Sequence, residues 1–207
     1  MRACPRLILG LIFVLLPATA LSAQTFSSDR AELQLETVAE GLEHPWSLAF
    51  LPDGSQLVTE RPGRLRLIDN GQLRPEPIAG LPDLVVSGQG GLLDIVLHPD
   101  FAANRTLFLS YAHEQSGAGM TTRVAKARFD GKQLQNVEVI FEALPRSWTS
   151  RHFAGRMEFD PEGNLYIAVG DRGEKDRAQD TADDAGGVHR LTVDGKPAPG
   201  NPFLNDD

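Results

Sequence analysis

Short apolar runs alternate with turn-forming residues along most of the chain. In the stretch 150–173, a short apolar run is followed by the turn Asp160-Pro161-Glu162-Gly163 and then by the denser apolar run Leu165–Val169. Proline and glycine in a turn between two apolar runs predict a strand–turn–strand unit. Polar and ionisable residues gather where these strands begin and end, which is a common arrangement for a site carried by loops on a rigid sheet.

The same unit recurs in two other places. An apolar strand, a turn containing proline and a second apolar strand occur around Pro52 and Pro99 as well as around Pro161. In each of the three units, a later strand is followed by a turn dipeptide: Asn70-Gly71, Asp130-Gly131 or Asp194-Gly195. A β-repeat of about 40–50 residues is typical of a propeller blade. The longer second interval between the prolines indicates an insertion around 141–151.

We therefore predict an all-β fold and favour a β-propeller over a β-sandwich. A sandwich also uses short strands with regular turns, but it does not predict a repeated proline turn with a repeated Asp-Gly end. Frequent proline and glycine argue against long helices. Known propellers usually have four to eight blades, so about three repeats imply an open arc. We expect the chain to be a C-terminally truncated fragment of a longer protein.

The first 23 residues have the layout of a secretory signal peptide. Arg2 and Arg6 precede a short apolar run, Leu7–Leu16, and small residues up to Ala23 offer a cleavage site. The apolar run is shorter than the roughly 20 residues that a membrane-spanning helix needs. We therefore expect a mature chain without a membrane span that begins near residue 24, in a protein that is periplasmic or secreted by a bacterium.

Composition narrows the range of partners. The 207 residues are 41% hydrophobic and 23% charged, with a formal net charge of −8, which is ordinary for a globular protein. An acidic balance argues against nucleic acid and anionic membranes as partners, because both favour basic patches. The single cysteine, Cys4, lies in the predicted signal peptide. The mature chain is therefore expected to have neither a disulfide nor a thiolate metal site.

Three stretches carry candidate chemistry, and each has a plainer interpretation. His152, beside Arg151, is suited to accept a proton near neutral pH, and a structural histidine is the alternative. Glycines around Gln89 would let a ligand approach the backbone closely, unless this stretch is only an inter-blade turn. The acidic stretch 170–184, which includes Asp171, lacks the spacing of an EF-hand calcium loop, and a solvated loop is the alternative.

Several ordered motifs resemble one enzyme family. The chain contains, in this order, HPWSLAFLPDG, GQGGLLDIVLHPDF, RHFAGRMEFDPEGNLYIAVGDRG, AQD and DGKPAPGNPF. This set resembles the soluble PQQ-dependent sugar dehydrogenases, the glucose/sorbosone dehydrogenase family, and especially its aldose sugar dehydrogenase branch. The resemblance covers about residues 38–205. It implies a six-bladed propeller with four-stranded blades and about twice this length, of which residues 24–207 would be the N-terminal half.

The resemblance also implies roles for individual residues. His152 would be the catalytic base, which takes the proton of the anomeric hydroxyl of an aldose while hydride passes to PQQ, so that a lactone forms. Gln89 and Arg151 would contact the cofactor, and Gln89 and Asp171 would contact the sugar. Arg151 stands where the glucose enzymes carry aspartate, so a preference for glucose is not implied.

The same resemblance predicts the remaining cofactor and partners. Calcium would accompany PQQ, but its ligands and the basic clamp of the quinone would lie beyond Asp207, so we expect no metal ligand in this chain. An aldose and a respiratory electron acceptor would be the partners. Without its second half, the chain is expected to be inactive towards aldoses and to expose apolar sheet faces.

Two other functions stay open on the sequence. A lactonase-like hydrolase on the same fold would need a central metal, held by inward-pointing acidic or amide side chains from several blades. A non-catalytic propeller would instead bind carbohydrate or protein on one face. For the favoured enzyme, we expect His152 and Gln89 to point into one shared cleft on the axial face.

Overall fold

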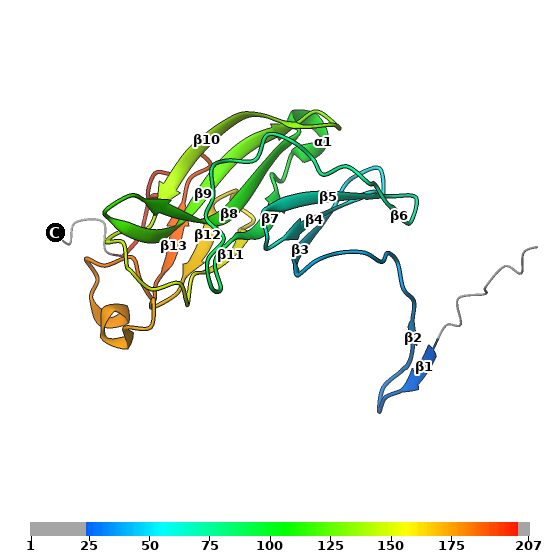
Figure 1. Cartoon of the computed structure of the whole chain (residues 1–207), viewed down its shortest axis with the longest axis horizontal. Helices are drawn as coiled ribbons and strands as arrows, with labels where there is room; N and C mark the ends of the chain where they lie inside the picture. The colour runs from blue at the N-terminus through cyan, green and yellow to red at the C-terminus, as the bar shows by residue number, and fades with distance from the viewer. Residues whose placement is uncertain (1–23, 203–207) are drawn as a thin grey trace, which may run out of the picture. The chain divides into compact units, whose positions relative to one another are not determined.

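The computed structural model describes residues 24–202, and the regular secondary structure of these residues is almost entirely β-strand (Figure 1). The predicted signal peptide at 1–23 lies outside the described residues. The chain divides into two compact units, 1–38 and 39–207, and each is described by itself. None of the described helices is long and apolar enough to cross a membrane.

The first unit contains an antiparallel hairpin. Its strands are β1 (Gln24–Ser27) and β2 (Glu32–Leu35), and all of their residues are exposed. The hydroxyl of Ser28 accepts a hydrogen bond from the amide of Ala31 at 3.1 Å, which closes the turn.

The second unit contains three antiparallel sheets that follow one another along the chain. The first consists of β3 (Pro45–Phe50), β4 (Gln56–Glu60), β5 (Arg64–Asp69) and β6 (Gln72–Leu73). The second consists of β7 (Leu92–Leu97), β8 (Thr106–Gln115), β9 (Gly119–Phe129) and β10 (Leu134–Glu142). The third consists of β11 (Ala154–Phe159), β12 (Leu165–Val169) and β13 (Val188–Leu191). Two short helices, α1 (Phe101–Asn104) and η1 (Lys175–Gln179), lie in connections.

The first strand of each sheet is the innermost one. In every sheet the strands lie side by side in chain order, and β7 contacts both β3 and β11. Three sheets that extend outward from adjacent inner strands are consecutive blades of a propeller. The prediction of an all-β propeller, present as about three blades, is therefore confirmed.

The proline turns occupy equivalent places. Pro52, Pro99 and Pro161 each lie two residues after the innermost strand of their blade. Because neighbouring strands are antiparallel, the connection that follows the first strand of a blade lies at the edge opposite to the connection that precedes it. Figure 1 shows this for the second blade, where α1, just after Pro99, lies at the other end of β8 and β9 from the turn that joins them.

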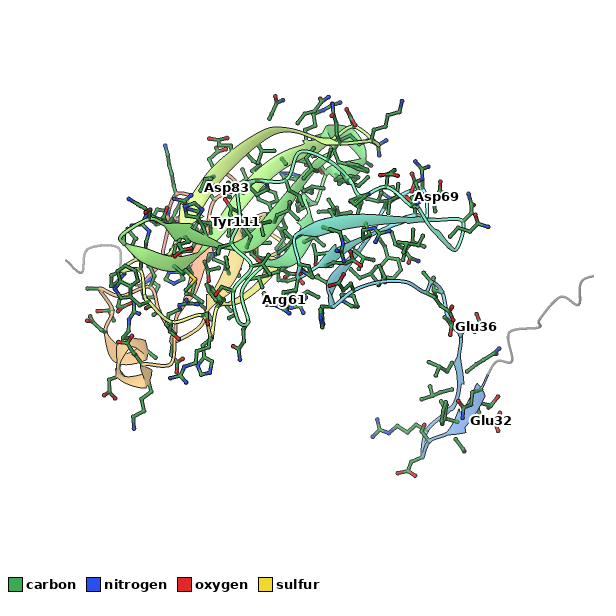
Figure 2. The ribbon with its side chains drawn as sticks, in the orientation of Figure 1. Glu32, Glu36, Arg61, Asp69, Asp83 and Tyr111 are labelled. Carbon is green, nitrogen blue, oxygen red and sulfur yellow. The ribbon has the colours of Figure 1, made fainter. Side chains whose placement is uncertain are left out.

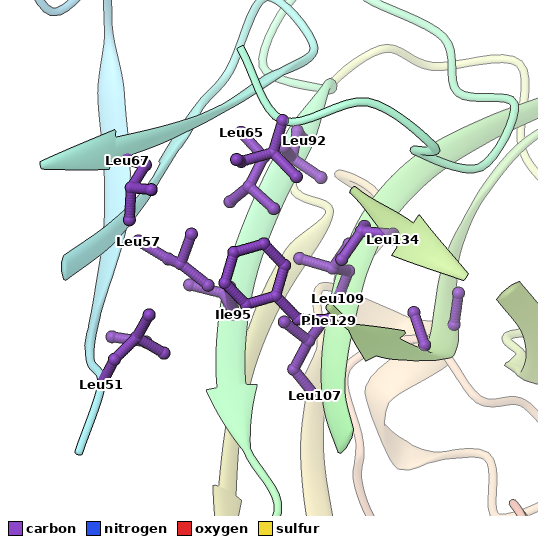
Figure 3. Close-up of a cluster of buried hydrophobic side chains, with 14 of the residues drawn as sticks. Leu51, Leu57, Leu65, Leu67, Leu92, Ile95, Leu107, Leu109, Phe129 and Leu134 are labelled. Atoms are coloured by element: carbon purple, nitrogen blue, oxygen red, sulfur yellow. The ribbon is translucent and has the colours of Figure 1, made fainter. Parts of the chain in front are cut away.

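Apolar faces of adjacent blades pack together to form the core. Between the first two blades, the buried side chains come from both sheets and meet as Figure 3 shows; they include Leu57, Leu65, Leu67, Leu92, Ile95, Leu107 and Leu109. A second cluster joins the second blade to the third; it includes Phe108, Val124, Met157, Leu165 and Ile167. Burying each such side chain stabilises the fold by roughly 1.5–3 kcal/mol, so the blades hold one another in place.

A buried carboxylate links the three innermost strands. Asp94 of β7 is 1% exposed, and it accepts hydrogen bonds from the hydroxyl of Ser47 on β3 and from the amide of Met157 on β11, the latter at 2.6 Å. Arg156 of β11 also donates to it at 3.1 Å while lying over the ring of Trp46 at 4.6 Å. Asp94 therefore fixes the relative positions of all three blades.

Some elements differ from the expectation. The sequence indicated an insertion around 141–151, but part of that stretch completes β10 and only the segment 143–153 is a connection. The expected apolar sheet faces are also less exposed than predicted. Leu92 of β7 and Leu165 of β12 are fully buried between blades, whereas Leu48 and Phe50 of β3 are exposed.

Candidate active site

Three connections place the predicted site residues at one edge of the blades. Residues 74–91 precede β7 and carry Gln89, residues 143–153 precede β11 and carry His152, and residues 170–187 follow β12 and carry Asp171. Each of these connections lies at the edge opposite to the proline turn of its blade. The structure therefore brings together residues from three separate parts of the sequence.

His152 and Asp171 form a close pair. The Nδ1 atom of His152 lies 2.7 Å from Oδ1 of Asp171, and the imidazole is 49% exposed. The backbone of His152 adopts a positive φ of 52°, which is uncommon outside glycine. Its carbonyl lies so close to Gly170 that a Cβ at that position would clash with it. The glycine before Asp171 therefore permits the close approach of the two loops.

Asp171 is held as a carboxylate. The amide of Gly173 donates to its Oδ1 at 2.8 Å, and this hydrogen bond, followed by the one with His152, lowers the pKa of Asp171 below its usual value. An ionised partner favours the tautomer in which Nδ1 of His152 carries the proton. The Nε2 atom of His152 then presents a lone pair that is able to accept a proton.

Gln89 holds the backbone on which His152 lies. The side-chain Oε1 of Gln89 accepts a hydrogen bond from the backbone amide of His152 at 2.8 Å. The backbone amide of Gln89 donates to the carbonyl of Ser150 at 2.8 Å. Gly88, with a φ of 56°, lies against Ser150 so closely that a Cβ would clash with it. The glycine-rich stretch is therefore an inter-blade connection that also supports the candidate base. Gln89 thus contacts the backbone of His152, whereas a shared axial cleft and the roles of both residues remain predictions.

Two arginines add positive charge at this edge. Arg151 is exposed, and its guanidinium lies against Gly173, where a side chain would clash with it. Arg61, labelled in Figure 2, lies in the turn between β4 and β5 and donates to the carbonyl of Gly88 at 2.8 Å. Neither arginine has an ion-pair partner within residues 24–202. Sequence reasoning missed Arg61, because nothing in its turn indicates a contact with a glycine of the next blade.

The acidic stretch 170–184 is structured by its own ion pairs. Asp183 pairs with Arg177 at 2.6 Å, and Asp184 accepts a hydrogen bond from the amide of Leu144 at 2.7 Å. In the part of the chain that the structure describes, no three His, Cys, Asp or Glu residues are grouped so that they could hold a metal ion. Asp183 and Asp184 therefore anchor a loop instead of extending into solvent.

Known proteins share this sequence and fold. The Glucose / Sorbosone dehydrogenase family matches residues 42–207. The aldose sugar dehydrogenase YliI of Escherichia coli is 37% identical over 94% of this chain and 53% of its own length. The crystal structure of the soluble aldose sugar dehydrogenase from Escherichia coli, in the apo form, superposes with a TM-score of 0.79 at 38% identity, over 83% of this chain and 50% of that one.

A further solved structure is the PQQ-bound form of an aldose sugar dehydrogenase from Streptomyces coelicolor. It has a TM-score of 0.73 and 32% identity, and the match covers 90% of this chain and 54% of that one. The chain thus spans about half the length of the relatives it matches. The family match covers the three blades and all four predicted site residues. The chain belongs to the glucose/sorbosone dehydrogenase family.

Proposed function

We propose that this chain supplies the proton-accepting part of an active site that oxidises the anomeric carbon of aldose sugars to lactones, with PQQ as the hydride acceptor. The observation that carries the proposal is the pair formed by His152 and Asp171 at 2.7 Å, at the loop edge of a propeller from a sugar dehydrogenase family. An oriented histidine with one free ring nitrogen has the properties of a general base.

The proposed reaction begins with binding of an aldose so that its anomeric hydroxyl faces His152. Nε2 of His152 takes the hydroxyl proton, and Asp171 stabilises the imidazolium that forms, because its carboxylate already accepts a hydrogen bond at Nδ1. As the C1=O bond forms, the hydrogen on C1 leaves with its electron pair, and the sugar becomes a lactone. PQQ, when bound, supplies the acceptor for that hydride.

The residues at this edge fit an anionic quinone. The guanidinium groups of Arg151 and Arg61 have no carboxylate partner among residues 24–202, and Nε2 of Gln89 donates no hydrogen bond within the same residues. Arginine is well suited to bind carboxylates. Arg151, Arg61 and Gln89 are therefore the residues of this chain that would hold PQQ.

Other parts of the proposal rest on the resemblance to the family. Calcium is proposed as a second cofactor, but residues 24–202 provide no cluster of metal ligands, so no step is assigned to it. We also propose that the protein is exported to the periplasm or secreted. Its substrate there would be an aldose, and a respiratory electron acceptor would reoxidise the cofactor.

Removal of the base tests the proposal. In a full-length protein that contains these residues, reconstituted with PQQ and calcium, His152→Ala should lower dye-linked oxidation of aldoses by about 10²–10⁴-fold, the usual contribution of a general base, while PQQ stays bound. His113→Ala is the control, because His113 lies outside the pair, with a long contact of 3.4 Å to a carbonyl. A His152 variant with wild-type turnover would reassign the base. Lactone hydrolysis without quinone would instead favour the hydrolase.

A further inference from the structure

Arg172, the residue after Asp171, is buried in an unusual way. It is 3% exposed, although arginine is seldom fully buried unless it is paired. Its guanidinium lies over the ring of Phe153, 3.5 Å from the ring centroid. Its Nη2 donates to the carbonyl of Thr149 at 2.6 Å. The side chain therefore contacts residues on both sides of His152 in the sequence.

This arginine is incompletely satisfied. Its Nε and Nη1 atoms are buried without a hydrogen-bond partner among the described residues, and no carboxylate within them pairs with it. Burial, together with the charge of Arg177, lowers its pKa to about 10, so it is still a cation at neutral pH. Leaving buried donors unpaired typically costs about 1–3 kcal/mol. Buried donors that stay unpaired in a folded protein are found most often at functional sites.

The contacts of Arg172 connect the segment that carries His152 with the segment that carries Asp171. Its backbone continues directly from Asp171, and its φ of 56° turns the chain there. Gly90 lies so close to the Phe153 ring that a Cβ there would clash with it. Phe153 thus contacts both Arg172 and the loop that carries Gln89. Any shift of Arg172 would move the segment 149–153 relative to Asp171.

We propose that Arg172 is a positioning residue that holds the segment 149–153 in register with Asp171. In this position, Nδ1 of His152 stays hydrogen-bonded to Asp171, and Nε2 remains the free nitrogen. Cation–π contact with Phe153 and the charge-assisted hydrogen bond to Thr149 supply the attachment. That this positioning serves catalysis rests on the proposed function. That Arg172 holds the segment 149–153 in register with Asp171 does not depend on it.

The experiment is nitrogen NMR of the imidazole of His152 in the full chain, with the resonance assigned through His152→Gln. In the wild type, we expect a protonated Nδ1 that is hydrogen-bonded and an unprotonated Nε2. Arg172→Met keeps an unbranched apolar stem but removes the guanidinium. We expect this variant to lose the Nδ1–H signature and to show a mixture of tautomers.

Arg177→Met is the matched control. Arg177 anchors the same loop, but through Asp183, the hydroxyl of Ser147 and the carbonyl of Pro145 instead of the segment 149–153. We expect it to leave the tautomer unchanged, even if the melting temperature falls. Arg172→Lys is the second variant, in case the methionine variant does not fold. It keeps the charge and loses the planar stacking group, so we expect partial loss of the signature.

An unchanged His152 spectrum in either folded Arg172 variant would overturn the inference, and so would an equal effect in Arg177→Met. The measurement needs neither sugar nor PQQ. If a reconstituted full-length wild-type protein that contains these residues failed to oxidise any aldose, the proposed function would fall, while the NMR result would still decide the role of Arg172.

Discussion

At the scale of single residues, the charge of Asp171 determines how His152 is held. Hydrogen bonds from Gly173 and His152 lower the pKa of Asp171, so the carboxylate is more acidic in the folded than in the unfolded chain. Such a group stabilises the fold above its unfolded pKa, near 3.8. That contribution is lost as the pH falls through the lower folded pKa. The pair therefore depends on an acid group that stays ionised in mildly acidic solution.

We predict that Asp171→Asn makes the stability of the chain less sensitive to acid. Asparagine cannot be protonated, so the part of the acid destabilisation that comes from this carboxylate disappears. Urea denaturation at several pH values between about 2 and 5 measures the effect. The slope of unfolding free energy against pH should be shallower in the variant over the acidic part of this range. Equal slopes in the two proteins would mean that the pair does not contribute to stability.

At the scale of elements, the three innermost strands are joined by polar contacts as well as by apolar packing. Asp94 accepts hydrogen bonds from β3 and β11 while lying on β7. Nearby, Ser110 of β8 donates to the carbonyl of Gly155 on β11 at 2.6 Å, and Thr59 of β4 donates to that of Leu93 on β7 at 2.6 Å. These bonds cross between blades, so they determine how far one blade can rotate against the next.

Removal of the carboxylate of Asp94 should destabilise the propeller unit strongly. Asp94→Ala leaves the amide of Met157 and the hydroxyl of Ser47 without their acceptor, and we expect a loss of about 3 kcal/mol in unfolding free energy. Denaturant titration gives the value. Asp69→Ala is the control, because Asp69, which Figure 2 labels, forms an exposed ion pair with Arg74, and such pairs contribute about 0–1 kcal/mol. A loss as small as that of the control would show that Asp94 is not a structural link.

The sequence predicted the blades well because turn chemistry is local. Proline after an apolar strand and glycine after a later one mark each repeat, and these signals depend only on neighbouring residues. The outer strand β10 was not fully predicted. Only one of its residues is buried, so its sequence has a weak apolar pattern. Asp94 was visible as a polar residue in an apolar strand, but its partners lie on other blades.

The candidate site was predictable only in part. His152, Gln89 and Asp171 were found from their residue types and from the resemblance of their motifs to a family, and the structure shows that they lie together. Arg172 carried no such signal, since an arginine in a glycine-rich loop is normally exposed. Its burial depends on Phe153 and Gly90, which come from other connections. Contacts of this kind are fixed by tertiary packing and cannot be read from the order of residues.

At the scale of the whole molecule, the first blade has an apolar face without a partner among residues 39–202. Leu48 and Phe50 lie on the same side of β3, because alternate residues of a strand share a face, and they are 45% and 67% exposed. Exposed apolar surface on a sheet favours association. We therefore expect this face to be the main site of association of the isolated chain in solution.

We predict that the chain self-associates through this face. Replacing both Leu48 and Phe50 with lysine should raise the monomer fraction measured by sedimentation velocity, because two charges oppose apolar contact. Gln72→Lys is the control, since it adds a charge at an exposed polar position of the same blade. If the double variant associates as strongly as the wild type, another surface is responsible.

The separation of the two edges of the blades has a practical consequence. The proline turns lie at the edge away from His152, and Glu162 is an exposed residue of one of them. Residues 24–207 contain no cysteine, so Glu162→Cys would introduce a unique thiol in that part of the chain. Coupling through this thiol to a gold electrode or a bead would orient every molecule alike. The loops that carry His152 would then face the solution.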